Sequence, residues 1–411
     1  GMTRLKIRDF GPILSGCTEE GGWIDIRKTT LFIGNQGSGK STVAKLYSAL
    51  SWIEKAIVKG QIKPGDLKTY NRFLKQLNFQ RIDSYITETT EIEYAGRAYH
   101  ISYKAGKFKA RKNDGNGYLL PKIMYVPAER NFLGVVDRPD KLKNLPSPLY
   151  AFLDEYDHAR NLYSKGIDLP IGNARFEYDS LNKIAHISGG NYKLRLSEGS
   201  SGFQSTVPLY LVTRYLTESL SRENDPSIKT QSIEDQRKLA KEIERIINDT
   251  SLSEEVRQEY LRQLSARYKP ACLINIVEEP EQNLFPQSQR KLLNSLLEFT
   301  NANDGNKLLI TTHSPYLINY LSIAIQGAYL YNAIKNSKNS VELTNKLEEI
   351  IPVKAVLNSK DAVIYQMDEE KGTISRLADF EGIPSDKNYL NQSIREGNIL
   401  FDKLLEIEEE L

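Results

Sequence analysis

The sequence predicts an α/β fold: a mixed sheet as the core, with an antiparallel β subdomain and a helical lobe. Three observations indicate it. A glycine-rich loop at 34–41 lies between a predicted strand and a predicted helix. Segment 271–277 is an almost continuous apolar run, as in a strand buried on both faces of a parallel sheet. A helix that begins at Pro286 then leads to a further strand at 307–310, so strands and helices alternate.

The residues before the glycine loop alternate in hydrophobicity, and those after it follow a helical period. From Val43 to Ile57, apolar side chains recur at steps of three and four residues, and Gly60 ends the predicted helix. Segment 81–112 alternates again and predicts a meander of antiparallel strands. The strands predicted ahead of the loop cover 5–10, 23–26 and 29–33.

The middle of the chain is predicted to be mostly helical. A short strand at 122–126 precedes a region in which prolines indicate irregular connections, with one helix near 149–163. A second helix is predicted over 204–220. The charged segment at about 225–269 has the apolar spacing of a helical hairpin, with a break near 248–251.

The last part of the chain, 354–411, is predicted to hold short strands and a terminal acidic helix. We therefore expect two lobes. One lobe combines residues 1–125 and 271–411 and contains the glycine loop. The other, residues 126–270, contains most of the predicted helices.

Composition excludes several classes of protein. The 411 residues are 40% hydrophobic and 26% charged, which is ordinary for a globular chain and excludes wholesale disorder. The net charge is +2, so the surface as a whole does not attract polyanions. Two cysteines, Cys17 and Cys272, are too few for a disulfide scaffold or a zinc ribbon. The apolar stretches are shorter than a membrane span, and we expect a cytoplasmic protein.

The loop at 34–41, Gly-Asn-Gln-Gly-Ser-Gly-Lys-Ser, matches the pattern G-x-x-x-x-G-K-[ST] at every fixed position. In such a loop, backbone N–H groups and the dipole of the following helix face the phosphates of a nucleotide. Lys40 is expected to bind the β- and γ-phosphates, and Ser41 to ligate Mg²⁺. The alternative is a glycine turn that only caps a helix. The nucleotide-binding residues predicted here are Asn35, Gly37, Ser38, Gly39, Lys40, Ser41 and Thr42.

Two carboxylates follow the predicted buried strand. Glu278 and Glu279 stand where that strand ends, and open α/β sheets bind their ligands at the carboxyl ends of strands. Hydrolysis of a γ-phosphate needs a magnesium ligand and a group that polarises water. We predict that Glu278 holds the metal and that Glu279 is the general base. The alternative is a pair of solvated loop charges.

His313 follows the strand at 307–310 and is the histidine best placed for chemistry. A neutral imidazole there could contact both the γ-phosphate and the attacking water. The other three histidines fall in segments with strand or helix periodicity, where packing or surface roles are expected: His100, His158 and His186.

Taken in order, these motifs resemble those of the ATP-binding cassette (ABC) ATPases, in the stand-alone branch that includes SMC, RecF and OLD-like proteins and AAA-family relatives. The resemblance covers nearly the whole chain. It implies a P-loop NTPase fold and a head-to-tail dimer in which each nucleotide lies between one chain's loop and the partner's signature motif. The motifs are the strand 5–10, the loop 34–41, Tyr125-Val126-Pro127, Ser200-Ser201-Gly202, the stretch 278–286 and Thr312-His313-Ser314.

The signature motif allows two registers. Ser201 with Gly202 is the register that is similar to the stand-alone relatives, and Ser197 with Gly199 is the alternative. In either case the hydroxyl and backbone amides at the start of a helix would hold the γ-phosphate of the partner's nucleotide.

The sequence departs from the family pattern at two places. Segment 125–130 carries no glutamine where transporter ATPases have one, so Glu129 is a possible metal ligand there. Arg130 is a candidate for a contact with phosphate or with the partner chain, or for a structural pair with a glutamate. Glu278 stands where the family usually has aspartate, and its extra methylene lengthens the reach to a metal.

The resemblance implies a magnesium-dependent ATPase whose ATP-driven dimerisation acts as a switch in DNA maintenance or phage defence, beside a separate effector such as a nuclease. The basic segment 104–112 is either a solvated surface or a nucleic-acid contact. The hairpin at 225–269 is either solvated or a partner contact. The alternatives for the whole chain are a transporter subunit, a non-hydrolytic nucleotide sensor or scaffold, and a P-loop kinase.

Overall fold

The computed structural model describes residues 2–65, 67–115, 117–223, 233–380, 382–386 and 388–409. Its centre is a seven-stranded sheet in the order β2-β16-β15-β4-β14-β13-β8. The last five strands of that order run parallel, while β16 is antiparallel to β15, so the predicted mixed α/β sheet is confirmed. The strands are β2 (Gly16–Cys17), β16 (Thr373–Arg376), β15 (Ala362–Asp368), β4 (Thr29–Ile33), β14 (Lys307–Thr312), β13 (Cys272–Glu278) and β8 (Pro121–Val126).

Strand β4 shows why the central sheet is covered on both faces. All five of its residues are buried. Leu31 and Ile33 join one hydrophobic cluster, whereas Phe32, which points to the opposite face, joins another. The second cluster contains the apolar side of α1 (Lys40–Val58). The first is built with α4 (Ser147–Leu162), α5 (Ser201–Glu223), α8 (Pro286–Asn301) and α9 (Pro315–Ile334).

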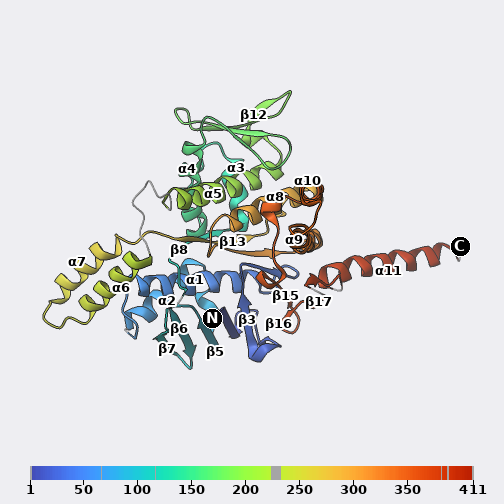
Figure 1. Cartoon of the computed structure of the whole chain (residues 1–411). Helices are drawn as coiled ribbons and strands as arrows, with labels where there is room; N and C mark the ends of the chain where they lie inside the picture. The colour runs from blue at the N-terminus through green and yellow to red at the C-terminus, as the bar shows by residue number, and fades with distance from the viewer. Residues whose placement is uncertain are drawn as a thin grey trace.

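A five-stranded antiparallel sheet lies beyond α1, on the side away from the helices α5 and α8 (Figure 1). It contains the predicted meander and the first strands of the chain. The helix α2 (Leu67–Phe79) packs against it, with Phe73 next to Phe108 and Tyr103. In sheet order the strands are β3 (Trp23–Ile26), β1 (Thr3–Phe10), β5 (Ile86–Ala95), β6 (Tyr99–Lys104) and β7 (Lys107–Lys112).

The segment predicted as irregular, 131–196, holds more structure than its sequence indicates. The helix near 149–163 is present as α4. It is preceded by the short helix α3 (Asn131–Val135) and followed by a four-stranded antiparallel sheet above the helices in Figure 1. These strands are too short to show a clear period: β9 (Ile167–Asp168), β10 (Arg175–Asp179), β11 (Ile184–Ser188) and β12 (Lys193–Arg195).

The predicted hairpin at 225–269 is confirmed as α6 (Ile233–Ile247) and α7 (Glu254–Ser265); positions 225–232 lie outside the described residues. It packs through its own small cluster onto the end of α1. Gly60 makes this approach possible, because a Cβ there would lie 2.5 Å from a methyl carbon of Ile243. Ser253 caps α7 by accepting a hydrogen bond from the Val256 N–H (3.3 Å).

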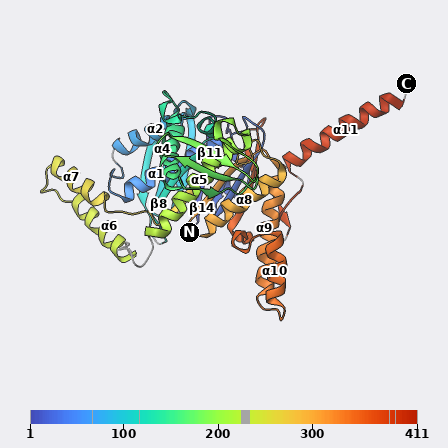
Figure 2. The same cartoon turned by 90° about the horizontal axis from the view of Figure 1, so that it is seen from above.

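The chain after His313 forms mainly helices. After α9 come α10 (Ser340–Ile350), the strands β15 and β16 of the central sheet, the strand pair β17 (Asp379–Phe380) and β18 (Ile383–Pro384), and α11 (Tyr389–Glu409). Both views show α11 extending away from the rest of the molecule, which agrees with the predicted terminal helix (Figures 1 and 2). In the described part of the chain, none of the helices is both long and apolar enough to cross a membrane.

Candidate functional site

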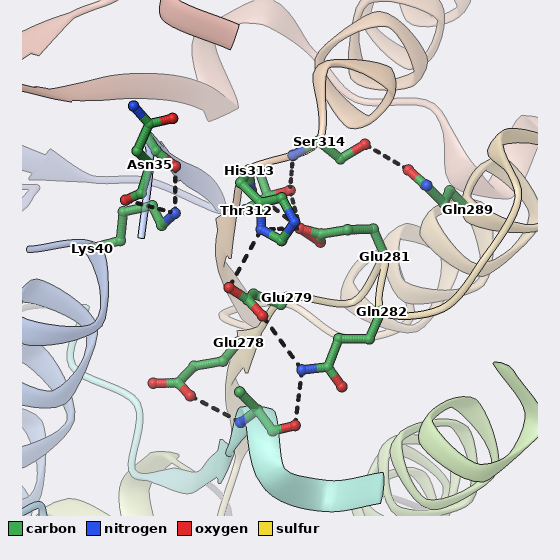
Figure 3. A network of polar contacts seen from close by, with 12 residues as sticks. Asn35, Lys40, Glu278, Glu279, Glu281, Gln282, Gln289, Thr312, His313 and Ser314 are labelled. Atoms are coloured by element: carbon green, nitrogen blue, oxygen red, sulfur yellow. Dashed lines mark hydrogen bonds and ion pairs between the residues drawn. The ribbon is translucent and has the colours of Figure 1, made fainter. Parts of the chain in front are cut away.

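Three neighbouring parallel strands end at one edge of the central sheet. β14 lies between β4 and β13, so the segments that follow these strands meet at that edge. They are the glycine loop after β4, the carboxylate loop (279–284) after β13, and Thr312 to Ser314 at the end of β14. Figure 3 shows side chains from all three segments turned toward one region.

The glycine loop has the backbone that its pattern predicts. Gly37 and Gly39 have φ values of +78° and +102°, in the region that favours glycine. Gly39 is the residue before α1, and a Cβ on it would lie 3.2 Å from a side-chain carbon of Ile13. The loop therefore needs glycine both for its turn and for its close contact with the chain beside it.

Lys40 lies inside this loop and donates hydrogen bonds to the carbonyls of Gly34 and Asn35, the latter at 3.3 Å. Its side chain is buried, and burial lowers the pKa of the ammonium group. The carboxylates of Glu279, Glu281 and Glu278 act in the opposite direction, in that order. Lys40 therefore faces the carboxylate loop across the site.

Glu278 is buried, and its carboxylate is bound at both oxygens. Oε1 accepts a hydrogen bond from the hydroxyl of Tyr125, and Oε2 accepts one from the Ala128 N–H at 2.9 Å. Ser41 is near the same hydroxyl, where it acts against the rise in the pKa of Tyr125 that burial and Glu278 cause. A hydroxyl and a carboxylate this close together are oxygen donors of the kind that Mg²⁺ prefers. The side chain of Glu278, one methylene longer than that of aspartate, reaches both the Tyr125 hydroxyl and the Ala128 N–H.

Glu279 has a backbone conformation that is unusual for a residue with a side chain. Its φ is +48°, and its N–H donates to the Thr311 carbonyl at 2.8 Å. Its Oε1 lies 3.4 Å from Nδ1 of His313, and its Oε2 lies 3.4 Å from Nε2 of Gln282. The hydrogen bond from His313 is the main reason that the pKa of Glu279 is lowered, so the group is ionised at neutral pH.

His313 lies between two carboxylates. Besides Glu279, its Nδ1 is 3.8 Å from Oε1 of Glu281, and its backbone N–H donates to the same oxygen at 3.2 Å. The hydrogen bond with Glu279 raises the pKa of His313, against the effect of burial. The imidazole is nevertheless 47% exposed, which leaves it accessible from solvent.

Glu281 anchors the segment that carries His313. Its Oε1 accepts a hydrogen bond from the Thr312 hydroxyl at 2.5 Å, while Oε2 is buried with no hydrogen-bond partner among the described residues. Burial raises the pKa of this carboxyl. The network continues from the Ser314 hydroxyl to Oε1 of Gln289 at 2.6 Å. A cavity of about 510 Å³ lies next to it, lined by Glu281, His313 and neighbouring side chains.

Arg130 does not face solvent, so a contact with phosphate or with a partner chain was the wrong alternative. It is fully buried on the short turn η3 (Ala128–Arg130) and donates to the carbonyls of Glu278 (2.6 Å) and Glu279 (2.7 Å). Burial lowers its pKa to about 10, so it stays charged at neutral pH. The alternative of a structural role is therefore correct. Arg130 bonds the backbone carbonyls of the two glutamates, however, and not their carboxylates. Glu129, on the same turn, is exposed.

The two signature registers differ in their surroundings. Ser197 donates its hydroxyl to Asp137 at 2.6 Å, whereas Ser201 is exposed at the first residue of α5. Gly202 is buried, and a Cβ there would lie 2.9 Å from the carbonyl oxygen of Asn283. The start of α5 thus packs directly on the carboxylate loop and leaves the Ser201 hydroxyl open.

The structure therefore brings the predicted residues Lys40, Ser41, Glu278, Glu279 and His313 into one site. Sequence reasoning missed the side chains that hold them. Glu281 belongs to the stretch 278–286, where it is the third carboxylate, and that was the available signal. Tyr125 belongs to the motif Tyr125-Val126-Pro127, although its contact with Glu278 was not predicted. Nothing local in the sequence pointed to Gln282 and Gln289.

Comparison with known proteins found an ATPase family that matches part of the chain. Residues 256–318 match the family model described as the AAA ATPase domain. An SMC head domain from Thermotoga maritima is similar at 11% identity and a TM-score of 0.38, over 92% of this chain and 99% of that chain. The crystal structure of an SMC head bound to the C-winged helix domain of ScpA is similar at 9% identity and a TM-score of 0.34, over 91% and 96%. A search of curated proteins found no match.

The matched segment contains β13, the carboxylate loop, α8, β14 and His313. It is thus the part of the chain that supplies two of the three segments of the site. Over these residues the chain is similar to the AAA ATPase domain, which agrees with the AAA-family relatives named in the expected resemblance.

Proposed function

We propose that this chain is a magnesium-dependent ATPase that hydrolyses ATP to ADP and phosphate. The observation that carries the proposal is the convergence of Lys40, Glu279 and His313 from three neighbouring strand ends (Figure 3). A phosphate-binding lysine, an ionised carboxylate and an imidazole are the groups that hydrolysis of a terminal phosphate requires.

The glycine loop would hold the phosphates. Backbone N–H groups from Asn35 to Thr42 and the start of the long helix α1 favour negative charge, and Lys40 would exchange its two carbonyl partners for phosphate oxygens. Mg²⁺, when bound, would be held by Ser41 and Glu278, with Glu129 as a further candidate, and would neutralise charge on the phosphate oxygens.

Glu279 would take a proton from the attacking water. Its carboxylate is ionised and lies opposite Lys40, on the side of the site where the terminal phosphate would be bound. His313, exposed and hydrogen-bonded to Glu279, would orient that carboxylate and contact the phosphate.

ATP would also join two copies of the chain head to tail. The hydroxyl of Ser201 is open at the first turn of α5, where the helix dipole favours an anion from a partner. The engagement of Ser197 by Asp137 supports the Ser201 and Gly202 register. In this proposal ATP binding closes the dimer, and hydrolysis opens it.

We place this switch in the cytoplasm, in DNA maintenance or phage defence beside a separate effector such as a nuclease. Two features support the placement. Both cysteines are free thiols, which suits a reducing compartment. The edge strand β7 exposes Lys107, Lys109 and Arg111, which are suited to contacts with nucleic-acid phosphates.

The test compares the wild type with Glu279→Gln at saturating ATP and Mg²⁺. We expect turnover in the wild type and a loss of about 100-fold or more in the variant, with ATP binding retained. Glu408→Gln is the matched control, because Glu408 is exposed on the projecting helix α11. In solution, Glu279→Gln with ATP should have the mass of two chains.

A non-hydrolytic nucleotide sensor is the second candidate. It is favoured by the contacts that already engage the Glu279 carboxylate at both oxygens. Equal and negligible turnover in the wild type and Glu279→Gln, with ATP binding retained in both, would refute the ATPase and leave the sensor.

A further inference from the structure

We propose that Gln282 is a positioning residue for Glu279, a role that rests on the proposed ATPase function. Its side chain joins the carboxylate of the general base to the turn that follows β8, and so fixes the direction in which that carboxylate points. The contact is drawn in Figure 3.

One residue, Ala128, organises both carboxylates. Its N–H donates to Glu278 at 2.9 Å, and its carbonyl accepts a hydrogen bond from Nε2 of Gln282 at 2.8 Å. The same Nε2 lies 3.4 Å from Oε2 of Glu279. Glu278 is therefore positioned directly by Ala128, and Glu279 is positioned through the Gln282 amide.

The backbone of Gln282 is hydrogen-bonded at both its N–H and its carbonyl. Its N–H donates to the Glu279 carbonyl at 3.2 Å, and its carbonyl accepts a hydrogen bond from the Ser205 hydroxyl at 3.1 Å. Ser205 belongs to α5, which also carries the signature residues. These bonds fix the backbone of Gln282, and the bond from Nε2 to the Ala128 carbonyl fixes its side chain, so the side chain loses little freedom when it contacts Glu279.

The other partner of the Glu279 carboxylate is His313. His313 holds Oε1 of Glu279, but it is 47% exposed and would turn toward the phosphate when nucleotide binds. Gln282 would then be the side chain that still fixes Oε2. A carboxylate without it could rotate away from the attacking water, and misplacement by about 1 Å lowers turnover by roughly 100-fold.

The experiment uses Gln282→Ala and Gln282→Met in the full chain. Methionine keeps most of the side-chain volume and removes only the amide, so it tests the contact even if alanine disturbs folding. Gln258→Ala is the matched control, since Gln258 lies on α7 and bonds Glu254 on the surface. Turnover, KM, ATP affinity in the absence of turnover, and the thermal unfolding midpoint are measured for each.

We expect both Gln282 variants to lose about 100-fold in kcat while ATP affinity stays within about twofold and the unfolding midpoint stays near that of the wild type. A kcat within about twofold of the wild type overturns the inference and leaves the ATPase intact. A parallel loss of ATP affinity and stability in Gln282→Met assigns a structural role and also overturns it. A wild type that binds ATP without turnover ends both proposals together.

Discussion

Replacing Arg130 by methionine removes the group that joins the turn η3, the carboxylate loop and the start of α5. Arg130 donates four hydrogen bonds, to the carbonyls of Ser205 (3.1 Å), Pro127 (3.1 Å), Glu278 (2.6 Å) and Glu279 (2.7 Å). Methionine fills a similar volume but donates none. The four carbonyls would be left with an apolar neighbour inside the protein.

The magnitude follows from the burial of these contacts. A hydrogen bond to a charged group contributes about 1.5–3 kcal/mol net, so four independent bonds would contribute roughly 6–12 kcal/mol. Bonds that share one side chain do not add fully, and removing one buried charged partner typically costs about 3–5 kcal/mol, which is the loss in unfolding free energy that we expect. Glu279 has a φ of +48° and loses one of the bonds that hold it there, so turnover should fall by more than ATP affinity.

The assay is urea unfolding of the wild type, Arg130→Met and Arg138→Met, followed by turnover in the absence of urea. Arg138 is a partly exposed arginine that bonds only the neighbouring Asp140 carboxylate among the contacts described for it, so its replacement should change stability by less than about 1 kcal/mol. A loss below about 1 kcal/mol in Arg130→Met, or an equal loss in both variants, would show that the buried contacts contribute little.

Three further outcomes are expected. Lys40→Met should weaken ATP binding roughly 100-fold, a loss of about 3 kcal/mol. The unfolding free energy should not fall, because the lysine is a buried charge. Tight ATP binding by this variant in a nucleotide titration would contradict the role of Lys40. Gly202→Ala should lower the unfolding free energy by about 1–3 kcal/mol, since the added Cβ would lie 2.9 Å from the Asn283 carbonyl oxygen. An unchanged midpoint of urea unfolding would mean that α5 shifts to make room for the Cβ at no cost. Burial raises the pKa of Glu281 in the folded protein above its ordinary value of 4.5. Ionisation of Glu281 therefore lowers the unfolding free energy as the pH rises through the folded-state pKa, and above that pKa the whole of this loss is present. Glu281→Gln should therefore gain stability relative to the wild type between pH 4.5 and pH 8, and a pH-independent difference would refute this.

The glycine loop and the strand β13 could be predicted because their signals are local. The turn at 34–39 depends on three glycines within six residues of one another, and all three have positive φ angles, of +155°, +78° and +102°. The seven residues of β13 are buried throughout, as a largely apolar segment in a parallel sheet requires. Since parallel strands end at the same edge, the meeting of Lys40, Glu279 and His313 also followed from the order of the elements.

The burial of Arg130 and the sheet β9–β12 could not be predicted from the sequence. The sequence shows that position 130 carries a charge, but burial depends on what α5 and the carboxylate loop place over it. The strands of the small sheet have two to five residues each, which is too short for a period to stand out, and their pairing alone makes them strands.

The sequence by itself determined which chemical groups the site contains and at which strand ends they lie, because glycine geometry and hydrophobic period act over a few residues. Only the tertiary structure decided which partner each group has. Ala128 and Glu278 are 150 positions apart, and Glu281 and Thr312 are 31 apart, so their hydrogen bonds exist only after the parallel strands have paired. Those bonds direct the carboxylates and the imidazole, and their direction decides what the site can do.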